Sequence, residues 1–106
     1  MKVLVAEDSS TMRHILVKCL NSMGFNEIRQ FGDGESAVEW LDGSNEKPGL
    51  ILLDWNMPKM NGFQVLQHVR SQASTKSIPI IMVTTESEKD SVIKALSAGA
   101  NDYLIK

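Results

Sequence analysis

Three runs of consecutive apolar residues constrain this 106-residue chain more than any other feature, and they occupy positions 3–6, 50–53 and 80–83. Such short apolar runs are typical of strands that are buried on both faces of a parallel sheet. The middle run ends in Asp54, and Pro58 prevents the strand from continuing much further. We therefore expect Asp54 at the carboxyl tip of a buried strand, the place where open parallel sheets bind their ligands.

A stretch with helical periodicity follows the first run. Ser9 and Ser10 suit a helix N-cap, and Gly24 suits the residue just beyond the helix end. Between them, apolar residues recur at three- and four-residue spacing. We expect them to form one core-facing stripe, with Cys19 buried as a small apolar residue; the stripe comprises Met12, Ile15, Leu16, Cys19, Leu20 and Met23.

Capping residues predict three more helices. Asp33 suits the N-cap of a helix that ends near Gly43. A second helix should open at positions 61–62 and continue to about position 70. A third should follow Ser87, which has Asp90 three residues later in the form of a capping box.

Two further strands complete the pattern, at positions 27–31 and 102–105. The first alternates apolar and polar residues, as a half-exposed edge strand does. Five strands that alternate with helices predict βαβ units with right-handed crossovers and helices on both faces of the sheet. The predicted fold class is α/β, a flavodoxin-like doubly wound five-stranded parallel sheet in the order 2-1-3-4-5.

Composition narrows the classes of function. A chain of this length forms one domain. Its net charge of −2 provides no basic surface for nucleic acid or anionic lipid. No apolar run approaches the roughly 20 residues of a membrane span. The single cysteine excludes an internal disulfide and fits a reducing compartment, so we expect a cytoplasmic protein.

Polar residues follow the first, third, fourth and fifth strands at the same predicted edge of the sheet. Neighbouring strands lie about 4.8 Å apart, so these residues should form one cluster. Its three carboxylates repel one another, and Mg²⁺ with its preference for oxygen ligands would offset them. A hydroxyl and an ammonium suit phosphoryl oxygens, and Asp54 would be the nucleophile that forms an acyl phosphate. The cluster comprises Glu7, Asp8, Asp54, Thr84 and Lys106.

The chain resembles the receiver domains of the response-regulator family of two-component signalling, in particular its CheY-like members. The resemblance covers all 106 residues and rests on several motifs in order. They are the Glu7-Asp8 pair, Asp54 within Asp-Trp-Asn-Met-Pro, Gly62, Met-Val-Thr at positions 82–84, and Tyr103 with Lys106.

The resemblance implies a phosphorylation-activated switch that uses magnesium. Asp54 would be the phosphoacceptor, with Asp8, Asp54 and the backbone carbonyl of Asn56 as metal ligands and Glu7 acting through water. The chain would then be a stoichiometric phosphoacceptor with self-catalysed phosphorylation and dephosphorylation, and not an enzyme. Its partners would be a sensor histidine kinase and a downstream target, either the flagellar motor in chemotaxis or an output domain.

The resemblance also assigns roles around the acceptor. Thr84 and Lys106 would each bind a phosphoryl oxygen, and Tyr103 would be the switch aromatic that turns inward when Thr84 moves. Asn56 and Glu86 occupy the positions that tune dephosphorylation, and they predict a short-lived acyl phosphate.

Three alternatives share parts of this pattern. The segment could be the receiver half of a longer regulator with a DNA-binding or enzymatic output domain. An Asp-nucleophile phosphohydrolase would need an acid two residues after the nucleophile, where Asn56 stands. A flavin-binding module would need a phosphate-binding loop after the first strand, where Glu7 and Asp8 place negative charge.

The end of the sequence departs from the family pattern. Family members follow the lysine with a proline and a fifth helix, whereas here Lys106 is the last residue. We therefore expect residues 1–106 to be a receiver domain that is shortened at its C-terminus. Without the fifth helix, Val3, Val5, Leu104 or Ile105 would lack cover. A monomer is expected, with dimerisation through the bare face as the alternative.

Overall fold

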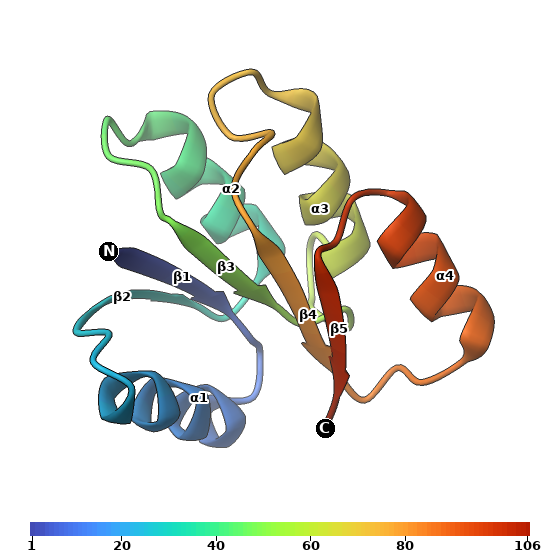
Figure 1. The fold of residues 1–106 in the computed structure, drawn as a ribbon, viewed down its shortest axis with the longest axis horizontal. Helices are drawn as coiled ribbons and strands as arrows, with labels where there is room; N and C mark the ends of the chain where they lie inside the picture. The colour runs from blue at the N-terminus through green and yellow to red at the C-terminus, as the bar shows by residue number, and fades with distance from the viewer.

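A parallel sheet of five strands crosses the molecule in the computed structural model, which describes residues 1–106 (Figure 1). The strand order is β2-β1-β3-β4-β5, and every neighbouring pair is parallel, as predicted. The elements are β1 (Lys2–Ala6), α1 (Ser10–Ser22), β2 (Glu27–Phe31), α2 (Gly34–Gly43), β3 (Leu50–Leu53), α3 (Gly62–Ser71), β4 (Ile80–Thr84), α4 (Lys89–Ser97) and β5 (Asp102–Ile105).

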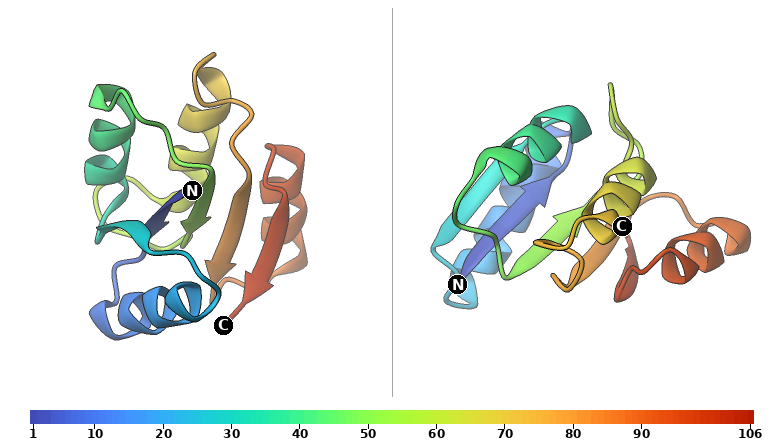
Figure 2. Two further views of the ribbon diagram at one scale, coloured as in Figure 1. Left: turned by 60° about the vertical axis from the view of Figure 1, so that its left-hand side comes forward. Right: turned by 90° about the horizontal axis from the view of Figure 1, so that it is seen from above.

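The two faces of the sheet are covered unequally. Helices α2, α3 and α4 lie on one face and α1 lies alone on the other (Figures 1 and 2). The three-helix face holds a core of 16 buried residues, while the α1 face holds five. No helix of the structure is long and apolar enough to span a membrane.

The predicted core-facing stripe of α1 is only partly buried. Leu20 packs against the sheet, but Ile15 is 47% exposed and Met23 is 65% exposed. Cys19 is also exposed, so the prediction that it is buried was wrong. The physical reason is that α1 has the sheet as its one packing partner, and a flat surface covers a narrower strip of a helix than two neighbours would.

Of the four residues that were expected to lack cover, two are buried and two are exposed. Val3 and Val5 are fully buried, because Leu16 and Leu20 of α1 pack over them. Leu104 is 51% exposed and lies beyond the reach of α1, at the edge of the sheet. Ile105 is 56% exposed. The expectation of missing cover was therefore wrong for β1 and correct for β5.

Side-chain caps begin three of the four helices. Ser9 and Asp33 accept hydrogen bonds from backbone N–H groups in the first turns of α1 and α2, and Asn61 forms a capping box with Gln64 at α3. The predicted capping box at Ser87 is absent: α4 begins at Lys89, and its N-cap makes no side-chain bond. The segment before α4 is instead held by backbone hydrogen bonds of Glu86 to Thr84 and Tyr103.

Candidate phosphorylation and metal site

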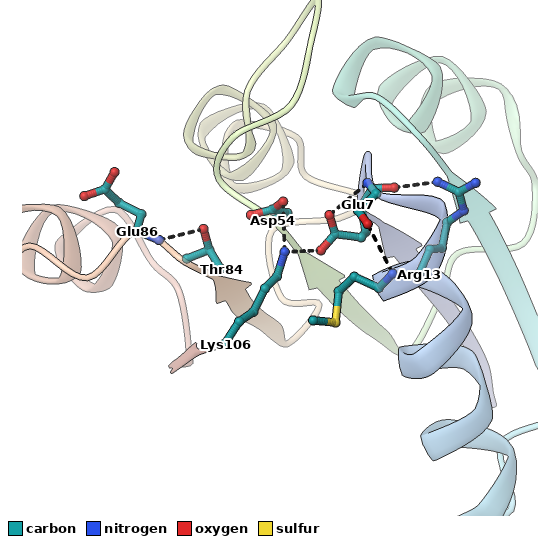
Figure 3. Close-up of polar contacts among 8 residues, drawn as sticks. Glu7, Arg13, Asp54, Thr84, Glu86 and Lys106 are labelled. Carbon is teal, nitrogen blue, oxygen red and sulfur yellow. Dashed lines mark hydrogen bonds and ion pairs between the residues drawn. The ribbon is translucent and has the colours of Figure 1, made fainter.

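The carboxyl ends of β1, β3, β4 and β5 bring the predicted cluster together (Figure 3). Backbone hydrogen bonds extend the strand pairing one residue past the strands: Asp54 N–H donates to the carbonyl of Ala6 at 2.9 Å, and Lys106 N–H donates to that of Thr84 at 3.0 Å. Glu7 N–H donates to the Phe31 carbonyl at 3.0 Å. The sheet itself therefore fixes the backbone of each of these site residues.

Glu7, Asp54 and Lys106 form a buried charged group. Glu7 is 1% and Asp54 5% exposed, and the Lys106 side chain is 12% exposed. Lys106 Nζ donates to Asp54 Oδ2 at 3.2 Å and forms an ion pair with Glu7 Oε1. Burial raises the pKa of Glu7. Burial alone would lower the pKa of Lys106, but its contacts with Glu7 and Asp54 raise it. One ammonium thus serves two buried carboxylates.

The carboxylate oxygens of this site that lack hydrogen bonds are suitable ligands for a divalent cation. Asp54 Oδ1 is buried without a hydrogen-bond partner, and Glu7 Oε1 has its ion pair but no well-directed hydrogen bond. Glu7, Asp8 and Asp54 each offer a carboxylate oxygen, and these oxygens lie within 4.8 Å of one another. Asp8 is exposed, so the cluster opens to water. Carboxylate oxygens with room for water ligands are the donor set that Mg²⁺ and Mn²⁺ prefer.

The start of α3 lies against the acceptor strand. A Cβ atom on Gly62 would come within 1.9 Å of the Asp54 carbonyl oxygen, so any other residue there would move the loop. Gly62 N–H donates to the Trp55 carbonyl at 2.8 Å. The Trp55 ring stacks on Phe63 with centroids 5.3 Å apart, and Lys94 Nζ of α4 lies 4.5 Å from the Phe63 centroid. The residue next to Asp54 is therefore packed against α3, and Phe63 connects it to Lys94 of α4.

Thr84 and Tyr103 meet through the backbone of Glu86. Glu86 N–H donates to Thr84 Oγ1 at 3.2 Å, and the Tyr103 hydroxyl donates to the Glu86 carbonyl at 2.6 Å. Ser91 Oγ donates to Glu86 Oε1 at 3.3 Å. Burial, together with the charges of Glu86 and Asp54, raises the pKa of Tyr103. Figure 3 shows the Thr84 hydroxyl bonded to Glu86, away from the pair formed by Lys106 and Asp54.

Asn56 is exposed in the loop after Asp54. Arg13, which the sequence did not single out, donates from Nη1 to the Glu7 carbonyl at 2.7 Å (Figure 3). A polar residue one turn into an amphipathic helix looks like a solvated side chain, so no pattern in the sequence marks it.

This arrangement of sheet and acidic cluster defines a class of protein. The family model for the response regulator receiver domain matches residues 3–106, and the chain belongs to that family. Its CheY homologues are receiver-domain phosphoacceptors and are not classed as enzymes. Membership of this family decides against the phosphohydrolase and flavin-binding alternatives.

Within the family the chain is CheY-like. It is 46% identical to chemotaxis protein CheY1 of Helicobacter pylori, over all of this chain and 85% of that protein. The Mn²⁺-bound form of response regulator Rcp1 matches with a TM-score of 0.90 and 31% identity, over all of this chain and 81% of that one. The complex of CheX, CheY, BeF₃ and Mg²⁺ from Borrelia burgdorferi matches with a TM-score of 0.92 and 29% identity, over all of this chain and 78% of that one.

Proposed function

We propose that Asp54 is the phosphoacceptor of this chemotaxis-type response regulator. The observation that supports it best is the contrast between the two oxygens of its buried carboxylate. Oδ2 accepts a hydrogen bond from Lys106, whereas Oδ1 is buried without a hydrogen-bond partner, and the carboxylate lies close to those of two other acids, Glu7 and Asp8. A buried carboxylate with a free oxygen at the tip of a strand is available both for a metal and for chemistry.

The reaction is a phosphoryl transfer. A carboxylate oxygen of Asp54 attacks phosphorus, the bond from phosphorus to the imidazole nitrogen of a phosphohistidine breaks, and the electron pair leaves with that nitrogen. Hydrolysis of the resulting acyl phosphate returns the carboxylate and releases phosphate. Lys106 holds Asp54 and neutralises part of the charge at the site.

Magnesium is the cofactor that we propose for this site. Asp8, Asp54 and the backbone carbonyl of Asn56 would hold it, with Glu7 acting through water. When bound, the ion would neutralise charge on the transferred phosphoryl oxygens. The structures of the two relatives named above, with Mn²⁺ and with Mg²⁺, support a divalent ion in this family.

The conformational response would begin at Thr84. The phosphoryl group carries up to two negative charges, while the carboxylate loses its own, and the Thr84 hydroxyl and Lys106 would bind the phosphoryl oxygens. Thr84 would then give up its hydrogen bond from Glu86, whose carbonyl is bonded to Tyr103. Movement of Thr84 would therefore change the hydrogen bond between the Tyr103 hydroxyl and Glu86. Asn56 and Glu86, beside this path, would tune the lifetime of the acyl phosphate.

The partners follow from this role. We propose a sensor histidine kinase as the phosphoryl donor and a downstream protein target, with the flagellar motor as the first candidate, in the cytoplasm. This segment would act as a monomer and would bind neither nucleic acid nor membrane. The relative that matches in complex with CheX supports recognition of this fold by a protein partner.

The test is phosphorylation with a small donor. Wild type, Asp54→Ala and Asp42→Ala would be incubated with acetyl phosphate and Mg²⁺, and incorporation measured by intact mass in the cold. Asp42 is an exposed carboxylate on α2 and serves as the matched control. We expect labelling of wild type and Asp42→Ala, its loss on omission of Mg²⁺, and none of Asp54→Ala. Equal labelling of Asp54→Ala would exclude it as the acceptor.

A further inference from the structure

Arg13 reaches from α1 to the backbone of the acidic turn. Its Nη1 donates to the Glu7 carbonyl at 2.7 Å, while the N–H of Glu7 donates to Phe31 at 3.0 Å. The guanidinium also lies close to Gly32, where an added Cβ would be 3.4 Å from Nη1. The backbone of Glu7 is thus held on one side by β2 and on the other by Arg13.

Asp8 has no comparable restraint of its own. It is exposed, and its carboxylate takes part in none of the hydrogen bonds or ion pairs of the structure, although it lies within 4.8 Å of the other acids. The carbonyl of Glu7 and the N–H of Asp8 belong to one planar peptide unit. A bond that fixes the Glu7 carbonyl therefore fixes the orientation in which the Asp8 residue leaves the sheet.

We propose that Arg13 is a positioning residue that aims Asp8 at the metal. This inference rests on the proposed function, because it takes Asp8 as a metal ligand. Residues that orient metal ligands typically change metal affinity 10- to 100-fold when they are removed. Arg13 itself is a donor and carries no group that coordinates a cation.

The direction of the effect separates positioning from plain electrostatics. A positive side chain beside an acidic cluster repels a divalent cation, so removal of its charge alone would tighten Mg²⁺ binding. Loss of the hydrogen bond to Glu7 would weaken it, because Asp8 would sample orientations that miss the ion. The two roles predict opposite changes.

The experiment measures Mg²⁺ affinity and not activity. Magnesium chloride would be titrated into Arg13→Met, Arg13→Lys and Arg29→Met, with emission of Trp55 recorded in a Trp40→Phe background. Arg29 is exposed on β2 and its substitution changes the net charge equally. We expect about tenfold weaker binding for Arg13→Met, partial recovery for Arg13→Lys and little change for Arg29→Met. Unchanged or tighter binding by Arg13→Met would overturn the proposal.

A double-mutant cycle with Asp8→Asn identifies the residue through which Arg13 acts. If Arg13 works through Asp8, Arg13→Met should weaken binding no further in the Asp8→Asn background. Additive losses would show that it acts elsewhere. If Arg13→Met does not fold, the same double-mutant cycle is measured with Arg13→Lys in its place. Loss of labelling in Asp54→Ala is independent of this outcome, so failure of the positioning role and failure of the proposed function are distinguishable.

Discussion

Buried charged side chains have different kinds of partner at the two ends of the sheet. At the carboxyl end, one lysine faces two buried carboxylates, and oxygens of Glu7 and Asp54 lack hydrogen bonds. At the amino end of β4 and β5, the Arg70 guanidinium donates to the carbonyls of Gly99, Lys76 and Ile78 and to Asn101 Oδ1, at 2.7 to 3.1 Å.

Asn101 extends this amino-end network into the sheet. Its Oδ1 also accepts from Ile80 N–H at 2.9 Å, and its own N–H donates to the Ile80 carbonyl at 2.8 Å. The charge of Arg70 is thus met by carbonyl dipoles, and burial lowers its pKa. The comparison indicates that one end of the sheet stabilises the fold, while the other keeps unsatisfied groups for a ligand.

The largest effect that we expect is loss of stability in Arg70→Met. The change leaves the carbonyls around α3, β4 and β5 without their donor, which should cost about 3 kcal/mol in the free energy of unfolding. Urea denaturation measures it. The rate of labelling by acetyl phosphate, per folded molecule, should not change.

Arg29→Met is the control for Arg70→Met, since Arg29 is exposed on the edge strand. Its effect should be within about 0.5 kcal/mol. A large change in labelling rate by folded Arg70→Met would show that the two ends of the sheet are coupled, and the division of roles would be wrong.

A change of opposite sign is expected at the carboxyl end. Asp54→Asn removes one of the clustered negative charges without changing shape, so without metal it should stabilise the protein by about 1.5 kcal/mol. Mg²⁺ should raise the stability of wild type and leave Asp54→Asn nearly unchanged, because only wild type gains from binding. The measurement is thermal unfolding with and without Mg²⁺. A destabilised Asp54→Asn would mean that Lys106 already satisfies the site.

Sequence patterns predicted the carboxyl end better than the amino end. Asp54, Glu7 and Thr84 each follow a run of apolar residues, so their places at strand tips are determined by the strands themselves. Arg70 binds mostly backbone carbonyls of distant segments, and Asn101 Oδ1 accepts from Arg70 and from the backbone N–H of Ile80. Backbone acceptors have no sequence signature, which is why neither that network nor the bond of Arg13 was predicted.

The errors concern packing partners. The stripe on α1 has the correct helical period, but burial of Cys19 depends on what else covers that face. The capping box expected at Ser87 failed because Glu86, one residue earlier, already holds the segment through Thr84 and Tyr103. Local patterns predict the elements, whereas competition among neighbours decides which contacts form.

A smaller effect is expected at the link between Tyr103 and Glu86. Tyr103→Phe removes the 2.6 Å hydrogen bond and should cost about 1 kcal/mol in stability. Tyr103 is also the one tyrosine of the chain, so tyrosinate absorbance reports it alone. Its pKa is raised above 10.0, so the folded protein loses the hydroxyl proton at a higher pH than the unfolded protein does. Stability should then fall as the pH rises above 10.0.

The pH dependence is checked by two titrations. The absorbance midpoint of the native protein should lie above that of the protein in urea, and the alkaline loss of stability should be smaller in Tyr103→Phe. Coinciding midpoints would show that the hydroxyl is solvated and that the bond to Glu86 contributes nothing.

The smallest effect is expected where the carboxyl end contacts α4. Lys94 lies over the Phe63 ring, which stacks on Trp55. Lys94→Met should cost about 0.5 kcal/mol, as exposed cation–π contacts do, and shift the emission of Trp55. Lys89→Met on the same helix is the matched control. Helix α4 buries one residue, and its N-cap makes no side-chain hydrogen bond. If Lys94→Met also changes the response of Trp55 emission to phosphorylation, the stack of Trp55 and Phe63 connects the acceptor to α4. An unchanged response would show that the acceptor is connected to α4 through Glu86 and Tyr103 instead.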